Sequence, residues 1–255
     1  MVASKRAAKL LMSEDFEVLY LNVHRKLEGL IEDLALGAPY EKFIEQIEKL
    51  KLIHEPISSW EYGIKPILLA LRGLKLRRPN LRIICYKNPL FEDLSDKNAA
   101  EVAALIFRVN STGKIDVKEW RNLIYKIIGE ADSFINEEAN YLLRASGELF
   151  RKLKTKAVCI SDFSGKHFVR YLRKTGVKIS LRYIFTPYYF TPLEVLIREA
   201  ARKLRRGTEI SDERLIKLVR FHAEYIREYV LPSTNYDNAY FKWLKDKRFM
   251  SIFET

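Results

Sequence analysis

The sequence predicts an α/β protein with a mostly parallel sheet of about four strands flanked by helices, an α-helical insertion and a helical C-terminal segment. Four short runs are rich in β-forming apolar residues, and segments with helical spacing of apolar residues separate them. Helical connections join parallel strands, because the chain has to cross back before the next strand begins. With 48% hydrophobic residues among 255, the chain can also bury a substantial core.

The predicted strands are short and apolar enough to lie inside a sheet. They are residues 16–23 (FEVLYLNV), 81–87 (LRIICYK), 156–161 (KAVCIS) and 177–185 (VKISLRYIF). Apolar runs bounded by charged or turn residues are typical of strands that are covered on both faces. Cys85 and Cys159 lie in two of these runs, so we expect both to be buried free thiols.

Helical periodicity accounts for most of the remaining chain. Ser58 and Glu61 have the spacing of a capping box, which predicts a helix start before the second strand. The stretch Thr191-Pro192-x-Glu194 predicts another helix start in the same way. The insertion at about residues 95–151 reads as helix. We expect a single α/β domain over residues 1–230 and an aromatic-rich docking segment over residues 231–255.

Positive charge is concentrated in one region of the chain, whose formal net charge is +12. Between Arg151 and Arg220, 18 Lys and Arg residues stand against six Asp and Glu residues. A basic surface attracts polyanions, so an anionic ligand or a nucleic acid is the expected partner. The alternative is that these side chains solvate helix faces, as in heat-stable proteins. The candidate anion-binding residues are Lys166, Arg170, Arg173, Lys174, Arg77, Arg78, Arg205 and Arg206.

The loops after the strands are where a parallel α/β sheet binds its ligands, because the carboxyl ends of the strands meet at one edge. Asn22 and His24 stand at the end of the first predicted strand, and Asn88 follows the second. We expect these three residues to line a cleft.

Candidate catalytic residues stand in the same predicted loops. They are His167 and Asp162 after the third strand, and the adjacent pair His54 and Glu55 between the first two. Imidazole titrates near neutrality and binds first-row metals, so such residues could form an acid–base pair or hold a divalent metal ion. Polarity at a turn is the alternative for His54 and Glu55, and helix capping is the alternative for Asp162.

The run SDFSGKH, residues 161–167, combines a predicted strand end with a helix start that holds Lys166. Free backbone N–H groups and a lysine at a helix start can form an anion pocket. N-capping by Ser161, Asp162 or Ser164 explains the same residues equally well.

No stretch of the sequence is apolar enough over a sufficient length to span a bilayer, and the N-terminus does not have the pattern of a signal peptide. We therefore expect a cytoplasmic protein that does not interact with membranes.

Residues 136–180, which open with Glu137-Glu138 and run through SDFSGKH, resemble the closing half of the TraB/ChaN/erythromycin-esterase-like superfamily. In that superfamily a helix with an initial acidic pair precedes a strand, a loop that ends in histidine, a helix and a further strand. The segments EVLYLNVHRKLEGLI and EPISSWEYG, with the helix and strand that follow, resemble its earlier part. The resemblance covers about residues 16–180.

The resemblance implies a hydrolase-like scaffold, and the differences imply a degenerate active site. Asn22 stands where the superfamily has a strand-end glutamate, and Ser164 replaces the glycine of a Gly-x-x-His motif in which His167 is kept. The expected function is therefore binding of an anionic partner through the basic C-terminal half. An active metal-assisted hydrolase that uses His167 and nearby carboxylates, and a nucleic-acid-binding accessory protein, are the alternatives.

Overall fold

The computed structural model describes residues 1–51, 53, 56–152 and 156–252. The chain forms two compact units. Unit 1 comprises Met1–Asp96 and Ser133–Thr186, and unit 2 comprises Lys97–Asp132 and Pro187–Thr255. Two long helices, α5 (Pro89–Thr112) and α6 (Val117–Lys152), contribute to both units.

Unit 1 contains the sheet. The described residues form three strands, β1 (Val18–His24), β2 (Arg82–Lys87) and β3 (Ala157–Cys159), in the order β2-β1-β3. Both strand pairs are parallel. The predicted α/β class and the first three predicted strands are therefore confirmed.

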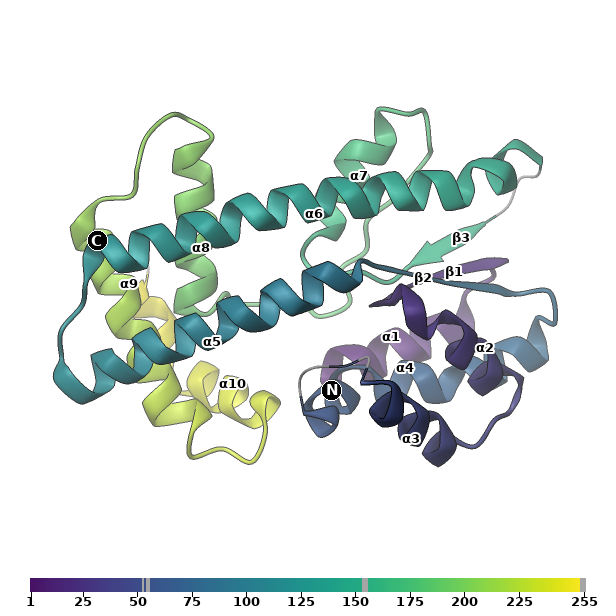
Figure 1. The fold of residues 1–255 in the computed structure, drawn as a ribbon, viewed down its shortest axis with the longest axis horizontal. Helices are drawn as coiled ribbons and strands as arrows, with labels where there is room; N and C mark the ends of the chain where they lie inside the picture. The colour runs from purple at the N-terminus through teal and green to yellow at the C-terminus, as the bar shows by residue number, and fades with distance from the viewer. Residues whose placement is uncertain (52, 54–55, 153–155, 253–255) are drawn as a thin grey trace. The chain divides into compact units, whose positions relative to one another are not determined.

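Helices cover both faces of this sheet (Figure 1). On one face, Leu19 and Leu21 pack in an apolar cluster with α1 (Val2–Ser13), α2 (Glu28–Leu36), α3 (Tyr40–Leu50) and α4 (Ile57–Arg77). On the other face, Tyr20 and Tyr86 pack with the second half of α6 and with α7 (Gly165–Arg173). The alternation of side chains along a strand sends successive residues of β1 into these two clusters.

The fourth predicted strand is wrong, because residues 177–185 form no strand in the structure. Two of these residues form contacts outside a sheet. The Ile179 carbonyl accepts a hydrogen bond from Arg173 at 3.1 Å, and Arg182 pairs with Glu14 at 2.9 Å. The prediction that Cys159 is buried is also wrong. Cys85 lies in the core, whereas Cys159 on the three-residue strand β3 is exposed.

Strands β1 and β2 lose their regular register at their carboxyl ends. Leu21 pairs with Cys85 and His24 pairs with Lys87, so two residues of β1, Asn22 and Val23, face one residue of β2. Such a β-bulge bends a strand and redirects side chains, and bulges are common beside functional sites.

Unit 2 is helical in the part of the chain that the structure describes. Parts of α5 and α6 accompany α8 (Pro192–Leu204), α9 (Asp212–Tyr225), a π-helical turn (Ile226–Val230), α10 (Tyr236–Lys245) and a 3-10 helix (Arg248–Ile252). The predicted capping box at Thr191 and Glu194 starts α8. The box predicted at Ser58 is wrong, since α4 begins at Ile57 after Pro56 without a side-chain cap.

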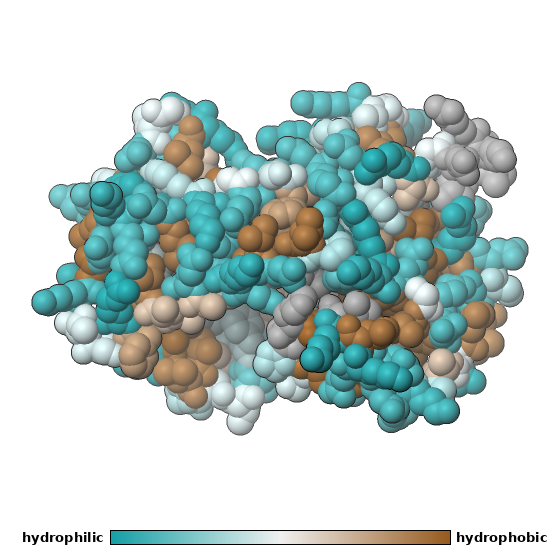
Figure 2. Space-filling model, in the orientation of Figure 1, coloured by the Kyte–Doolittle hydropathy of each residue, from teal (hydrophilic) through white to brown (hydrophobic). Residues whose placement is uncertain are grey.

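On the face drawn in Figure 2, hydrophobic side chains form separate patches among hydrophilic ones. None of the helices described here has both the length and the apolar character needed to cross a bilayer.

Candidate functional site

The carboxyl ends of the three strands bring polar residues together, as the parallel sheet predicts. Asn22 lies in the bulge near the end of β1, Asn88 comes directly after β2, and Asp162 follows β3. Helix α6 adds two glutamates from above this edge of the sheet. We define the carboxyl-end cluster as Asn22, Arg25, Lys87, Asn88, Glu137, Glu138 and Asp162.

Lys87 links two carboxylates of the cluster. Its Nζ lies 3.4 Å from Glu138 Oε2 and 3.4 Å from Asp162 Oδ2. The ammonium also lies 4.7 Å from the centre of the Phe91 ring, which is a favourable cation–π distance. The lysine is buried and only 1% of the Glu138 side chain is exposed, whereas half of the Asp162 side chain is exposed.

Asn88 joins both glutamates to the start of α5. Its backbone N–H donates to Glu138 Oε1 at 3.4 Å, and its Nδ2 donates to Glu137 Oε2 at 3.0 Å. Its Oδ1 accepts from the backbone N–H of Leu90 at 3.0 Å, so the side chain also satisfies a free donor in the first turn of α5. These bonds fix the position of the strand end relative to α6.

Arg25 holds Glu137 from the other side. The guanidinium donates to both Glu137 oxygens at 2.9 Å and, through Nε, to the Tyr86 carbonyl at 3.0 Å. The Tyr141 ring centre lies 3.7 Å from the guanidinium carbon. A bidentate pair stacked on an aromatic ring is a rigid arrangement, so Glu137 serves to position its neighbours.

Asn22 contributes an unsatisfied acceptor. Its Nδ2 lies 3.5 Å from Asp162 Oδ2, which orients the amide. Its Oδ1 is buried and has no hydrogen-bond partner among the described residues. Leaving a buried acceptor without a donor is costly, and such groups are uncommon in native proteins.

The surroundings shift the carboxyl pKa values of the cluster in opposite directions. Burial raises the pKa of Glu138, although nearby Lys87 opposes the shift. For Asp162, burial acts in the same upward direction, but Lys87 and the hydrogen bonds from Ser164 outweigh it and lower the pKa. Arg25 and Asn88 likewise overcome the effect of burial at Glu137 and lower its pKa. Two neighbouring carboxyl groups with opposed shifts are suited to separate acid and base roles.

The predicted catalytic residues have different outcomes. Asp162 belongs to the cluster, and its Oδ1 also accepts from the Ser164 N–H at 2.7 Å, which is the predicted capping role. This bond occupies a donor that the predicted anion pocket would need. His167 lies half-buried on the first turn of α7. His54 and Glu55 lie outside the described residues.

Of the predicted cleft residues, Asn22 and Asn88 join the cluster and His24 has a local role. His24 is buried, and its Nδ1 accepts from the Lys26 N–H at 3.1 Å at the start of the 3-10 helix Arg25–Leu27. Within residues 1–51, 53, 56–152 and 156–252, no three His, Cys, Asp or Glu side chains are arranged so that they could hold a metal ion together.

The predicted anion-binding residues fall into three groups. Arg77 donates to the Met12 carbonyl at 3.3 Å, and Arg78 donates to the Glu14 carbonyl, so both secure the end of α1. Arg205 and Arg206 belong to unit 2, where Arg205 pairs with Asp132 at 3.3 Å. The remaining four, Lys166, Arg170, Arg173 and Lys174, lie exposed on or beside α7 in unit 1.

Sequence reasoning missed the residues that α6 and β2 supply, Glu138 and Lys87. A signal for Glu138 was present, since it lies three residues after Ile135 and four before Leu142, on the apolar face of α6. A charge on an apolar helix face requires a partner of opposite charge.

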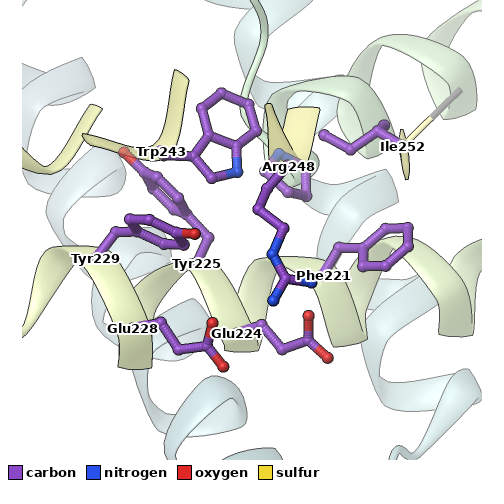
Figure 3. A pocket seen from close by; sticks show the side chains of 9 residues that line it. Phe221, Glu224, Tyr225, Glu228, Tyr229, Trp243, Arg248 and Ile252 are labelled. Carbon is purple, nitrogen blue, oxygen red and sulfur yellow. The ribbon is translucent and has the colours of Figure 1, made fainter. Parts of the chain in front are cut away.

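A small cavity lies in unit 2, apart from the carboxyl-end cluster. Its volume is about 20 Å³, and Tyr225, Tyr229 and Trp243 are among the residues that line it. Figure 3 shows Arg248 extending toward Glu224 and Glu228 in this pocket. A space of this size accommodates about one water molecule, so the carboxyl-end cluster is the better candidate site.

The fold and the site define an α/β protein with an ionisable cluster at the carboxyl edge of its parallel sheet. No protein-family model, curated protein or solved structure matches the chain.

Proposed function

We propose that the protein binds a small polar molecule at the carboxyl-end cluster and exchanges protons with it through Asp162 and Glu138, on a hydrolase-like scaffold. One observation carries the proposal: a buried lysine is shared by two carboxyl groups whose pKa values shift in opposite directions. Residues with shifted pKa values at a strand-end site are typical of functional sites.

Stability alone is a poor explanation for this arrangement. Removing Lys87 and Glu138 from water costs several kcal/mol per ion, and their mutual attraction recovers that cost only with good geometry. Contacts of 3.4 Å are long for charge-assisted hydrogen bonds. Apolar side chains of similar volume would stabilise the same place at least as well.

The polar atoms facing the site indicate the chemistry of the ligand. Asn22 Oδ1 is an acceptor without a donor among the described residues, and the Asp162 carboxylate is half-exposed beside it. Both groups accept hydrogen bonds, so the ligand that fits them carries hydroxyl or amine donors. A hydroxyl group placed there could pass its proton to Asp162, while Glu138, with its raised pKa, holds a proton more readily than an ordinary glutamate.

The resemblance to the TraB/ChaN/erythromycin-esterase-like superfamily supports hydrolysis as the reaction class, and we infer a divergent member. Asn22 in place of the strand-end glutamate cannot act as a base. The acid–base role in this chain therefore falls to Asp162 and Glu138, with Lys87 positioning both.

Binding can be tested by calorimetric titration with glucose, ribose and ethanolamine, each compared with a donor-free compound such as dimethyl ether of ethylene glycol. We expect at least one donor-bearing compound to bind and Asp162→Asn to weaken that binding at least tenfold. Asp96→Asn, which alters an exposed aspartate on α5, is the matched control. Equal binding by donor-bearing and donor-free compounds, or an unchanged affinity in Asp162→Asn, would contradict the proposal.

Proton exchange can be tested with glycerol monoacetate, an ester that carries hydroxyl donors, as a hydrolysis probe. A general acid or base contributes about 10²–10⁴-fold to a rate, so Glu138→Gln should lower the rate by at least about 100-fold and remove one limb of the pH profile. A pH profile that keeps both limbs in Glu138→Gln would exclude Glu138 from the reaction.

A further inference from the structure

We propose that the exposed face of α7 and the segment that follows it bind single-stranded nucleic acid. The surface consists of Lys166, Arg170, Arg173 and Lys174 with the exposed side chains of Phe163, Lys178, Leu181 and Tyr183, and we call it the α7 surface. It lies entirely in unit 1 and does not depend on the function proposed for the carboxyl-end cluster.

Helix α7 is amphipathic, and its basic side is the exposed one. Gly165, Phe168 and Val169 are buried, and Phe168 packs in the apolar cluster with Tyr20 and Tyr86. Lys166, Arg170, Arg173 and Lys174 follow the spacing i, i+4, i+7, i+8, which places them on one side of the helix. They cover about 12 Å of the helix axis, at 1.5 Å per residue.

The segment that carries this face is rich in basic residues and contains no acidic ones after Asp162. No Asp or Glu occurs in the sequence between Asp162 and Glu194. Among the described residues, no ion pair involves Lys166, Arg170 or Lys174. Basic residues that solvate a surface for stability are usually interspersed with acids, whereas a face of one sign attracts a polyanion.

Exposed aromatic and apolar side chains lie in the segments directly before and after α7. The segment after α7 is held against the helix, because Arg173 donates to the Ile179 carbonyl at 3.1 Å and the Leu181 side chain lies near Gly165. Tyr183 is 60% exposed and Phe163 is 47% exposed. Exposed aromatic rings next to Lys and Arg are the combination on which single-stranded bases stack while phosphates pair with the cations.

The burial of the apolar face of α7 argues against a membrane as the partner. A helix that lies in a lipid interface inserts its apolar side among the acyl chains. In α7 this side contains Phe168 and Val169, which are already packed in the protein. The partner therefore meets only the basic side and the scattered rings.

Fluorescence anisotropy with labelled single-stranded RNA and DNA of about 12 nucleotides tests the proposal, since such surfaces bind ~4–16 nucleotides. Four phosphate contacts predict a slope of about −3 for log K against log salt concentration. The variant Lys166→Gln, Arg170→Gln, Lys174→Gln should reduce the slope by about 2. Tyr183→Ala should weaken binding roughly tenfold through lost stacking.

The matched control replaces three exposed lysines on other helices of unit 1, Lys9, Lys42 and Lys49, by Gln. It removes the same net charge and should leave the salt slope unchanged. The proposal is overturned by equal effects of the two triple variants, or by an absence of binding at about 100 µM protein in low salt. Tighter binding to duplexes than to single strands, or binding to phosphatidylserine vesicles instead of oligonucleotides, would also overturn it.

Discussion

The buried pair of Lys87 and Glu138 gives the most direct test of whether the carboxyl-end cluster exists for stability or for function. Three variants are needed: Lys87→Met, Glu138→Leu and the double variant. Glu138→Leu leaves the buried ammonium with Asp162, half-exposed and 3.4 Å away, as its carboxylate partner. The double variant removes both charges and keeps a similar side-chain volume.

The magnitudes follow from burial. Removing one partner of a buried ion pair costs about 3–5 kcal/mol. Because Asp162 and the Phe91 ring still contact the ammonium, we expect the lower end of this range for Glu138→Leu, about 3 kcal/mol. The double variant should differ from the wild type by no more than about 1 kcal/mol, or be more stable. The coupling free energy between the two positions is then at least about 3 kcal/mol.

Urea unfolding followed by circular dichroism measures these free energies. A loss of about 3 kcal/mol also lowers Tm by roughly 10 °C in a chain of this size. The exposed pair of Arg108 and Glu119 provides the control, because alanine at both positions should give a coupling below about 1 kcal/mol. A double variant as unstable as the two single losses added together would refute the reasoning, since the cluster would then be structural.

Two further predictions concern packing away from the ion pair. Burial lowers the pKa of His222 from 6.5 to about 4, so folding excludes a proton that the unfolded chain binds, and stability is lost as the pH falls from 6.5 toward 4. His222→Leu should remove this loss of about 2–3 kcal/mol between pH 7 and 4.5, and an undiminished loss in urea unfolding would count against it. At Gly165, an added Cβ would lie 3.2 Å from Ser161 Cβ, so Gly165→Ala should cost about 1 kcal/mol. Ser161→Gly in the same chain should recover most of that cost, and a double variant no more stable than Gly165→Ala alone would show that this contact is not the cause.

The sequence was informative about the sheet wherever burial decides the structure. The runs that became β1 and β2 are apolar on both sides, and helices cover both faces of these strands, whereas β3, at the edge of the sheet, has Ala157 and Cys159 exposed. The run at residues 177–185 alternates apolar residues with Lys178 and Arg182, which is also a strand pattern. In the structure its Ile179 carbonyl bonds to Arg173 and its Arg182 pairs with Glu14, so local propensity did not decide its conformation.

The spacing of a capping box predicted a helix start correctly at Thr191 and incorrectly at Ser58. At Thr191 and Glu194 the side chains bond to one another's backbone, and α8 begins as predicted. At Ser58 the same residue types occur one residue inside a helix that already begins at Ile57. The spacing of a capping box does not by itself determine the first helical residue.

The candidate site was half predictable. The carboxyl ends of parallel strands lie at one edge of the sheet, so Asn22, Asn88 and Asp162 were expected to lie together there. This prediction needed only the positions of the strands in the sequence. To predict that the glutamates on α6 belong to the site, one would need to know where this long helix packs. No local sequence pattern contains this information. Arg25 was hidden for a similar reason, since its partner Glu137 lies 112 positions away in the sequence.

The packing of α6 on the sheet therefore completes the site as well as the core. Ala139 and Leu142 fill the apolar cluster above β1 and β2, and Glu138 is carried into the interior between them and the strand ends. A helix that packs this tightly places the carboxyl group of Glu138 within a fixed distance of Lys87, so the two cannot separate without opening the core. The pKa of Glu138 then depends on the integrity of this packing. A site built this way holds its charges in place before any ligand arrives, which is the condition under which a carboxyl group contributes most to proton transfer.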